Sequence, residues 1–312
     1  MSLVLWVVLG FLTIILLSGV YVFIVACVRR KELPWMIEEE IQKTNYAKYY
    51  NCICASDAWL KSHNAQDVYV RSKDGLKLHG YWIPAENPKG TILLAHGYRS
   101  TILVDFGLAY AFYHALGMNI LVPHQRAHGD SEGRYITFGV KESEDMACWI
   151  AYHNENFGLH QMILSGLSMG ASTVLYLADR DLPENVKCII ADCGFTSPKD
   201  ILDSVFCSIV HLPSGLSLFA ADLFARIFAG FSLKEKDTRK VLQSAKLPVL
   251  MIHGTADDFV PCEMTKQGFD ACTGQKELLL IENAGHGTSF LVDKEAYIKT
   301  VIAFLEKHLE DF

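Results

Sequence analysis

Apolar and polar residues follow one arrangement over the middle of the chain. Continuous apolar runs at 91–95, 119–122 and 186–191 are typical of strands buried on both faces. Between them, helical spacing of apolar residues predicts one helix that ends near 116 and another over about 140–156. Strands that alternate with helices in this way favour an α/β protein with a largely parallel sheet covered on both faces.

The alternation stops at about residue 194 and resumes at about 247. No strand pattern occurs in this stretch, and large apolar residues recur at helical intervals. They are Phe206, Leu212, Leu216, Phe219, Phe224, Ile227, Phe228 and Phe231. The sequence therefore predicts a small helical insertion into the sheet domain.

The first 30 residues have a different pattern. From Leu3 to Val28 the chain carries no charged residue, which is enough length for a helix to cross a hydrocarbon core. A buried core helix would show a polar face, and a cleaved signal peptide would have a shorter apolar region after basic residues. We predict a single transmembrane anchor over 1–30. Lipidation at Cys27, which ends a lipoprotein-like box, is the open alternative.

Positive charges follow the apolar segment directly, at Arg29, Arg30 and Lys31. The positive-inside rule then predicts a cytoplasmic catalytic part. Nine cysteines without paired spacing favour reduced thiols, which agrees with that location. Residues 31–64 alternate polar and apolar positions at helical spacing and predict a connecting helical arm, so the remaining domain covers 65–312.

Composition and charge exclude some functions. With 312 residues and 51% hydrophobic residues, the chain has ample material for a core. A net charge of -7, without a basic stripe, argues against a nucleic-acid partner. Cys52 and Cys54 are too close together for a zinc knuckle, and no second pair follows, so no metal is expected. The sequence leaves the oligomeric state open.

Ser168 is the candidate nucleophile. It ends an apolar run and precedes a helix-forming segment, and Gly166 and Gly170 stand two residues to either side. A sharp strand–turn–helix junction lifts a serine hydroxyl out of the backbone, and its crowding demands near-absent side chains at those two positions.

Two further motifs follow strand-like runs. They contain Asp257, in His-Gly-Thr-Ala-Asp, and His286, in Asn-Ala-Gly-His. Serine, acid and histidine follow in the order of an α/β-hydrolase, separated by about 90 and about 30 residues. At these motifs the chain resembles the α/β-hydrolase superfamily, particularly its esterase, monoacylglycerol-lipase and serine-aminopeptidase-like branch. The resemblance covers about residue 67 to the C-terminus.

The resemblance implies a Ser168–His286–Asp257 triad. The family motif His-Gly-x-x-Asp-x-x-Val-Pro fits only if Asp257 is the acid. Asp258 is adjacent, and Asp192 ends a strand from which some members of the superfamily take their acid, so both are rivals. The implied oxyanion donors are the backbone N–H groups of Met169, directly after the nucleophile, and of Tyr98.

Two other features take their meaning from the resemblance. The insertion at 194–247 corresponds to a cap over the active site. Its apolar residues suggest a substrate with an apolar acyl or alcohol group, or they pack the cap onto the sheet. Residues 125–133 are similar to the family stretch Arg-Gly-His-Gly-x-Ser-x-Gly but carry Ala127 where glycine is usual. We expect this stretch to have a structural role.

The expected function is a membrane-anchored serine hydrolase that cleaves carboxylic esters, lipid-like ones included, through an acyl-enzyme and without a cofactor. A serine aminopeptidase is the alternative within enzymes. A non-catalytic binding module with the same fold is the alternative outside them, although every motif position is filled.

Overall fold

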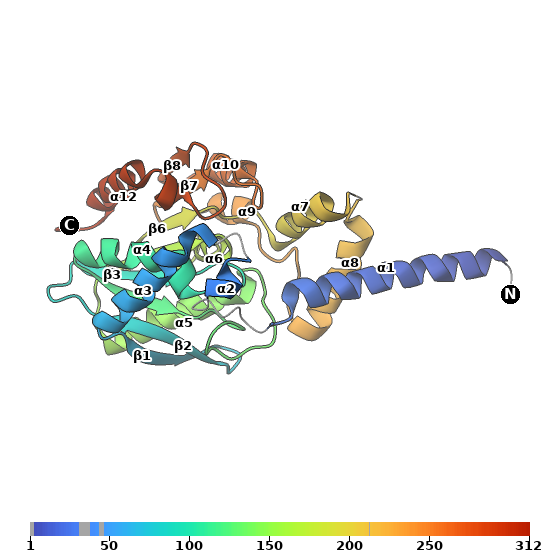
Figure 1. Cartoon of the computed structure of the whole chain (residues 1–312), viewed down its shortest axis with the longest axis horizontal. Coiled ribbons are helices and arrows are strands. Elements are labelled where there is room, and N and C mark those ends of the chain that lie inside the picture. The colour runs from blue at the N-terminus through green and yellow to red at the C-terminus, as the bar shows by residue number, and fades with distance from the viewer. Residues whose placement is uncertain (1–2, 31–37, 44–46, 212) are drawn as a thin grey trace.

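In the computed structural model, described residues are 3–30, 38–43, 47–211 and 213–312. They form one eight-stranded sheet with helices on both faces and a long helix that projects from one side (Figure 1). The predicted arm, 31–64, lies partly outside the described residues, as does Leu212 of the predicted insertion.

The sheet has the order β1-β2-β4-β3-β5-β6-β7-β8. β1 and β2 pair antiparallel, β2 and β4 pair antiparallel, and all other neighbours are parallel. The prediction of a largely parallel sheet is therefore confirmed. The strands are β1 Gln66–Arg71, β2 Lys77–Ile83, β3 Gly90–Ala95, β4 Met118–Pro123, β5 Met162–Leu167, β6 Val186–Asp192, β7 Val249–Gly254 and β8 Lys276–Ile281.

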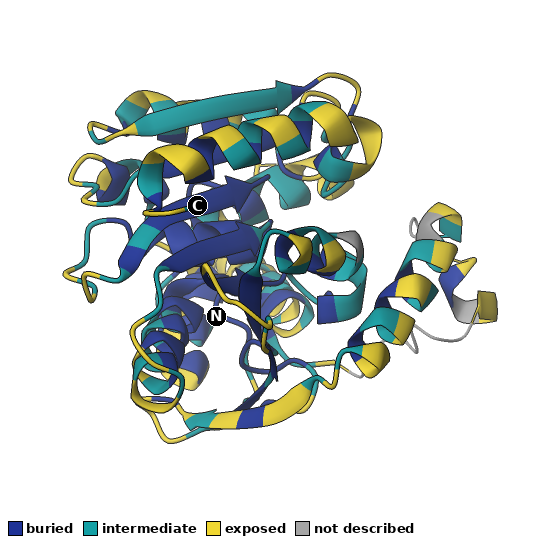
Figure 2. Cartoon of the chain, turned by 90° about the vertical axis from the view of Figure 1, so that its left-hand side faces the viewer, coloured by how far each residue is buried: buried dark blue, intermediate teal, exposed yellow. Residues whose placement is uncertain are grey.

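Helices cover each face over its own apolar core. One core joins the sheet to α5 (Val140–Asn156), α6 (Met169–Leu175), α9 (Thr238–Leu242) and α10 (Cys262–Ala271). The other joins it to α3 (Tyr50–Ser62), α4 (Ile102–Ala115) and α12 (Lys294–His308). The central strands are buried on both sides (Figure 2). This explains why they appear in the sequence as continuous apolar runs.

The helix after Ser168 ends at Leu175. The amides of Leu177 and Ala178 bond to carbonyls three residues back, at Val174 and Leu175. The chain therefore continues from this helix as a tightened turn.

The insertion is helical, as predicted. It contains α7 (Pro198–Val210), α8 (Gly215–Phe224), a π-helical turn η2 (Ala225–Ala229) and α9. α7 and α8 stand to one side of the sheet, and α8 lies along α1 (Leu3–Cys27) (Figure 1).

The end of α1 belongs to the folded domain. Phe23, Ala26 and Cys27 are buried in a third apolar cluster with residues of the insertion. The amide of Ile136 donates to the Cys27 carbonyl at 2.7 Å, and that of Arg29 donates to the Arg134 carbonyl at 2.8 Å.

The first part of α1 projects freely. The helix is long and apolar enough to cross a bilayer, with a mean hydropathy of 2.7 over its most apolar window, of which 6% is buried. A membrane anchor and a signal sequence share this property.

The described arm contains α2 (Glu38–Ile41), a 3₁₀ turn η1 (Ala47–Tyr49) and α3. Instead of merely connecting, α3 packs along α4, where Trp59 stacks on Tyr110 with ring centroids 5.8 Å apart. Ile41 and Ile53 are buried against Leu103. α11 (Ser289–Val292) lies between the His286 loop and α12.

Candidate active site

Ser168 occupies the junction between β5 and α6. Its backbone has φ 57° and ψ -116°, a strained conformation for a residue with a side chain. A Cβ on Gly166 would collide with the Gly170 carbonyl, and one on Gly170 would collide with the Ala95 carbonyl. The two glycines thus allow the tight turn that raises the serine.

His286 lies beside Ser168. Its Nε2 is 2.9 Å from the Ser168 Oγ, and its Nδ1 is 2.7 Å from Asp257 Oδ2. Because a carboxylate only accepts, Nδ1 carries the proton, and Nε2 is left to accept from the serine hydroxyl. The structure therefore brings together the three residues that the motifs selected.

Asp257 is held as an anion. Its side chain is fully buried, and its Oδ1 accepts hydrogen bonds from the amides of Phe259 and Val260, at 2.9 and 2.8 Å. Burial raises the pKa of Asp257, but hydrogen bonds from His253, His286 and the backbone outweigh it and hold the pKa well below its usual range. A permanent negative charge thus faces His286.

The two rival acids have other surroundings. Asp192 accepts a hydrogen bond from the Ser289 hydroxyl at 3.1 Å, and burial raises its pKa to about 6. Asp258 is exposed on the rim of the cavity next to Ser168. In the described structure, the carboxylate within hydrogen-bond distance of His286 is that of Asp257.

The loop after β3 carries the predicted donor of Tyr98. A Cβ on Gly97 would stand 3.3 Å from the Ser168 Cβ, so this loop passes directly beside the nucleophile. Met169 is the first residue of α6, and its N–H has no acceptor within the helix. The loop and the helix start thus lie on either side of the serine. The role of these two N–H groups stays a prediction.

Asp105, which the sequence analysis did not select, holds this loop. Its carboxylate accepts from the Gly97 amide and from the Ser100 hydroxyl, each at 2.5 Å. Burial raises the pKa of Asp105 to about 6. It sits in the first turn of α4, where nothing in the local sequence distinguishes it from a carboxylate that favours the helix dipole.

The side chains of Tyr98 and Arg99 point away from the site to the end of α1. The Tyr98 hydroxyl donates to the Ala26 carbonyl at 2.9 Å. The Arg99 guanidinium donates to the carbonyls of Val25 and Val28, at 2.7 and 2.9 Å. These residues satisfy the carbonyls that a helix leaves open at its C-terminus. The sequence analysis missed this contact because it joins segments about 70 positions apart.

Histidines brace the loop from the other side. His128 Nε2 accepts the Arg99 amide at 3.0 Å, and His96 Nε2 accepts the Gln125 amide at 3.0 Å. Burial lowers the pKa of His96 to about 3 and that of His128 to about 4, so both are neutral. They therefore support the structure without titrating near neutral pH.

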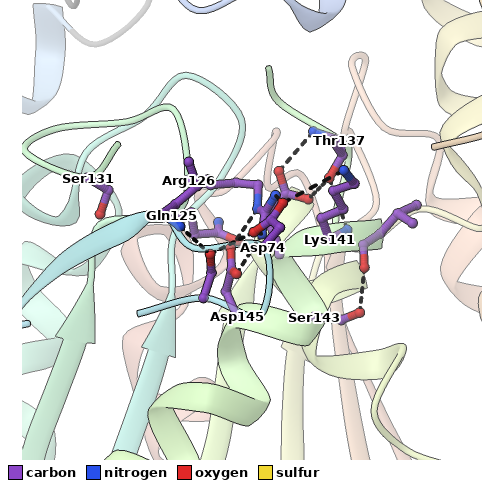
Figure 3. A network of polar contacts seen from close by, with 12 residues as sticks. Asp74, Gln125, Arg126, Ser131, Thr137, Lys141, Ser143 and Asp145 are labelled. Atoms are coloured by element: carbon purple, nitrogen blue, oxygen red, sulfur yellow. Dashed lines mark hydrogen bonds and ion pairs between the residues drawn. The ribbon is translucent and has the colours of Figure 1, made fainter. Parts of the chain in front are cut away.

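The stretch 125–133 is tied down by Arg126 (Figure 3). The buried guanidinium donates twice to Asp145, each at 2.7 Å, and to Asp74 at 2.9 and 3.1 Å. Ala127 has φ 61°. This left-handed conformation explains why glycine is usual there and why alanine departs at a cost in strain.

A cavity of about 830 Å³ opens beside Ser168 and His286. Its walls include Leu103 of α4, Phe290 of α11 and Ile53 of the arm. None of the described residues of 194–247 lines it. The expectation that the apolar residues of the insertion form the substrate pocket is therefore wrong, because the arm and α4 occupy that side.

Known proteins share this architecture. A family model described as the alpha/beta hydrolase fold matches residues 90–230. The uncharacterized protein YqkD of Bacillus subtilis is 29% identical over 243 residues, which are 76% of this chain and 78% of YqkD. Esterase Pf2001 of Pyrococcus furiosus superposes with a TM-score of 0.64 at 23% identity, over 80% of this chain and 92% of that one. A bacterial membrane phospholipase A superposes with a TM-score of 0.57 at 17% identity, over 84% and 93%.

The strand order, the serine junction and these likenesses define a protein with the α/β-hydrolase fold.

Proposed function

We propose that the chain is a membrane-anchored serine hydrolase that cleaves carboxylic esters. The observation that carries this proposal is the hydrogen-bonded series Ser168–His286–Asp257, with distances of 2.9 and 2.7 Å, on a strained strand–helix turn. A serine hydroxyl needs an adjacent base to act as a nucleophile, and the base needs a partner that fixes its tautomer.

The reaction follows from these positions. Ser168 Oγ attacks the ester carbonyl while its proton passes to His286 Nε2, and Asp257 stabilises the imidazolium that forms. The backbone N–H groups of Tyr98 and Met169 hold the negatively charged oxygen of the tetrahedral intermediate. His286 then protonates the leaving alcohol, and it later activates the water that hydrolyses the acyl-enzyme.

Lipid-like esters, such as monoacylglycerols or lysophospholipids, are the proposed substrates. The cavity is walled by Leu103, Phe106 and Phe290 among others, which suits an acyl chain, and α1 would hold the enzyme where such molecules concentrate. The cytoplasmic side of the membrane, from the charges after α1, remains part of the proposal.

A fluorophosphonate probe tests the nucleophile. The full chain is used in detergent micelles, because the end of α1 is part of the core, and adducts are measured by intact mass. We expect one adduct on the wild type and on Ser244→Ala, an exposed serine away from the cavity, and none on Ser168→Ala. Absence of an adduct on the folded wild type would favour the binding-module alternative.

Kinetics on a panel of esters test the mechanism and the substrate class. Asp257→Asn should lower kcat by about 10⁴, because the amide favours the wrong tautomer of His286. Asp192→Asn should lower kcat far less. Turnover restricted to short, water-soluble esters would contradict the lipid-like substrate.

One observation keeps the aminopeptidase alternative open to test. Asp258 lies on the cavity rim, where a carboxylate would pair with a substrate ammonium group. An aminopeptidase would hydrolyse aminoacyl amides faster than esters of equal length, and Asp258→Asn would remove that preference.

A further inference from the structure

The free part of α1 is too short to cross a membrane alone. α8 meets α1 at Ser18, whose hydroxyl lies 2.9 Å from that of Ser217. Residues 3–17 precede this contact, and at 1.5 Å per residue they span roughly 22 Å. A hydrocarbon core is about 30 Å thick. If the described helix Leu3–Cys27 is the segment that spans a bilayer, the part of it that packs against α8 lies within the hydrocarbon as well.

The α1–α8 contact has the character of helix packing inside membranes. A Cβ on Gly19 would collide with the Ala220 side chain, so the two backbones approach closely through small residues. The serine pair, Ser18 and Ser217, forms a hydrogen bond between the helices. Small residues and inter-helix hydroxyl bonds are what holds helices together where no hydrophobic effect operates.

The pairing continues with aromatic residues toward the domain. Phe23 contacts Phe224 and Phe228, with ring centroids 6.3 and 6.1 Å apart. Ser18 thus pairs with the start of α8, and Phe23 with its end. The two helices therefore run in the same direction, with the start of α8 nearer the N-terminus of α1 than the end of α8 is.

α8 and η2 expose an apolar stripe that nothing in the described chain covers. We call Leu216, Phe219, Leu223 and Ile227 the cap stripe. They are 55%, 70%, 47% and 62% exposed. Their spacing of three, four and four residues places them on one helix face. An apolar face of this kind is unusual next to water and indicates an interaction surface.

Acidic and basic residues are absent from most of α7 and α8, and the first ones that follow form an ion pair. Residues 204–221 contain no Asp, Glu, Lys or Arg. Asp222 and Arg226 come next, and they pair with each other at 2.9 Å. The segment at the depth of the hydrocarbon therefore carries no uncompensated charge.

We propose that the α7–α8 insertion is a second membrane-embedded element, which dips the cap stripe into the same leaflet as the C-terminal half of α1. The occupant of the stripe is the acyl region of a bilayer. The inference rests on the proposed anchoring of α1, and it adds that the cap, which lines no part of the described cavity, holds the domain against the membrane.

Photolabelling from within the bilayer tests this proposal. The full chain is reconstituted into phosphatidylcholine vesicles that contain a phosphatidylcholine with a diazirine on its acyl chain. After irradiation, labelled peptides are mapped by mass spectrometry. We expect adducts on α1 and on 215–229. We expect none around Leu159, which lies in the loop between α5 and β5 and is 75% exposed.

Matched variants make the result specific. Phe219→Glu combined with Ile227→Glu should reduce labelling of 215–229 at least about tenfold and leave labelling of α1 unchanged, because a carboxylate is excluded from hydrocarbon. Leu159→Glu replaces a similarly exposed apolar residue and should change the labelling of neither segment. All of the replaced side chains are exposed, and circular dichroism checks that the variants fold.

Each contrary outcome has its own meaning. Adducts on α1 alone would overturn the inference and leave the anchor in place. Adducts on neither segment would overturn the anchor and the inference together. Absence of lipid adducts on 215–229 in a chain that sediments as a dimer would overturn the inference and assign the surface to a second copy. Labelling needs no turnover, so failure of the proposed chemistry would appear only in the fluorophosphonate experiment.

Discussion

Ser168 shows how much of the site is dictated locally. Its left-handed φ of 57° and the two flanking glycines belong to one short turn, and neighbouring residues are enough to specify it. Asp257 and His286 likewise follow strands directly, at one edge of a parallel sheet. A motif therefore identifies these three residues, because each depends on its own strand end.

Residues that act across the chain could not be predicted in that way. Asp105 is an ordinary helix-start carboxylate until the fold brings the Gly97 amide to it. Arg99 resembles a surface residue in the sequence, yet it holds the end of α1. Their roles arise from contacts between distant segments, which composition and periodicity do not report.

The buried carboxyl of Asp192 should make stability depend on pH. Its pKa in the folded protein is about 6, against about 3.9 in an unfolded chain. Its stabilising contribution is therefore complete below about pH 4 and is lost as pH rises through about 6. Relative to Asp192→Asn, the wild type should lose roughly 3 kcal/mol of unfolding free energy across that range.

Thermal unfolding in detergent between pH 3.5 and 7.5 measures this difference. Asp258→Asn, the same replacement at an exposed position, serves as the control for the substitution itself. A constant offset between Asp192→Asn and the wild type would mean that burial does not raise the pKa of the Asp192 carboxyl.

At the scale of elements, two patterns predicted well: helical periodicity for a helix with one buried face, and continuous apolar runs for strands buried on both faces. The helix predicted over about 140–156 is α5, Val140–Asn156. The strand runs at 91–95, 119–122 and 186–191 are β3, β4 and β6 within about a residue. The insertion was predicted as helical, but of the two alternatives for its apolar residues, the one that they face the substrate is wrong, because none of its described residues lines the cavity. Periodicity identifies an apolar face and does not identify what that face contacts.

The close packing of α1 on α8 predicts a strong effect at Gly19. In Gly19→Val the new side chain would overlap Ala220, and overpacking of this kind costs about 1–3 kcal/mol. Gly10→Val is the matched control on the same helix, because no atom lies within 4 Å of a Cβ at that position. Melting temperatures in detergent should fall for the first variant only. Equal behaviour of the two would mean that α1 and α8 are not packed together.

For the whole molecule, the boundary between α1 and the sheet domain does not fall where the apolar run ends. The sequence predicts an anchor over 1–30 and an arm over 31–64 as separate units, and those boundaries stay predictions. In the structure, Phe23 and Cys27 are part of a core cluster, and Ile53 of the arm walls the cavity. An apolar run looks the same whether lipid or protein surrounds it.

Two truncations should distinguish the projecting part of α1 from the part that packs on the domain. Removal of residues 1–30 takes away the carbonyls that Tyr98 and Arg99 bind, and it should loosen the loop that carries a proposed oxyanion donor. We expect fluorophosphonate labelling to slow at least about tenfold, a fraction of the loss that follows removal of one donor. Removal of residues 1–16 keeps these contacts and should leave the labelling rate near that of the full chain.

Circular dichroism distinguishes a loosened loop from an unfolded domain in the shorter chain. Equal labelling rates for the two truncated forms, both folded, would show that the loop keeps its geometry without α1.

The contact between Ser18 and Ser217 also bears on the order of folding. The two residues are 199 positions apart, so α1 leaves the ribosome long before α8 exists. Throughout that interval its small-residue face, around Gly19, is without its partner in the native structure. The first helix to be synthesised is thus among the last to gain its native contacts. A bilayer is the environment in which an apolar helix can remain without its partner and not aggregate.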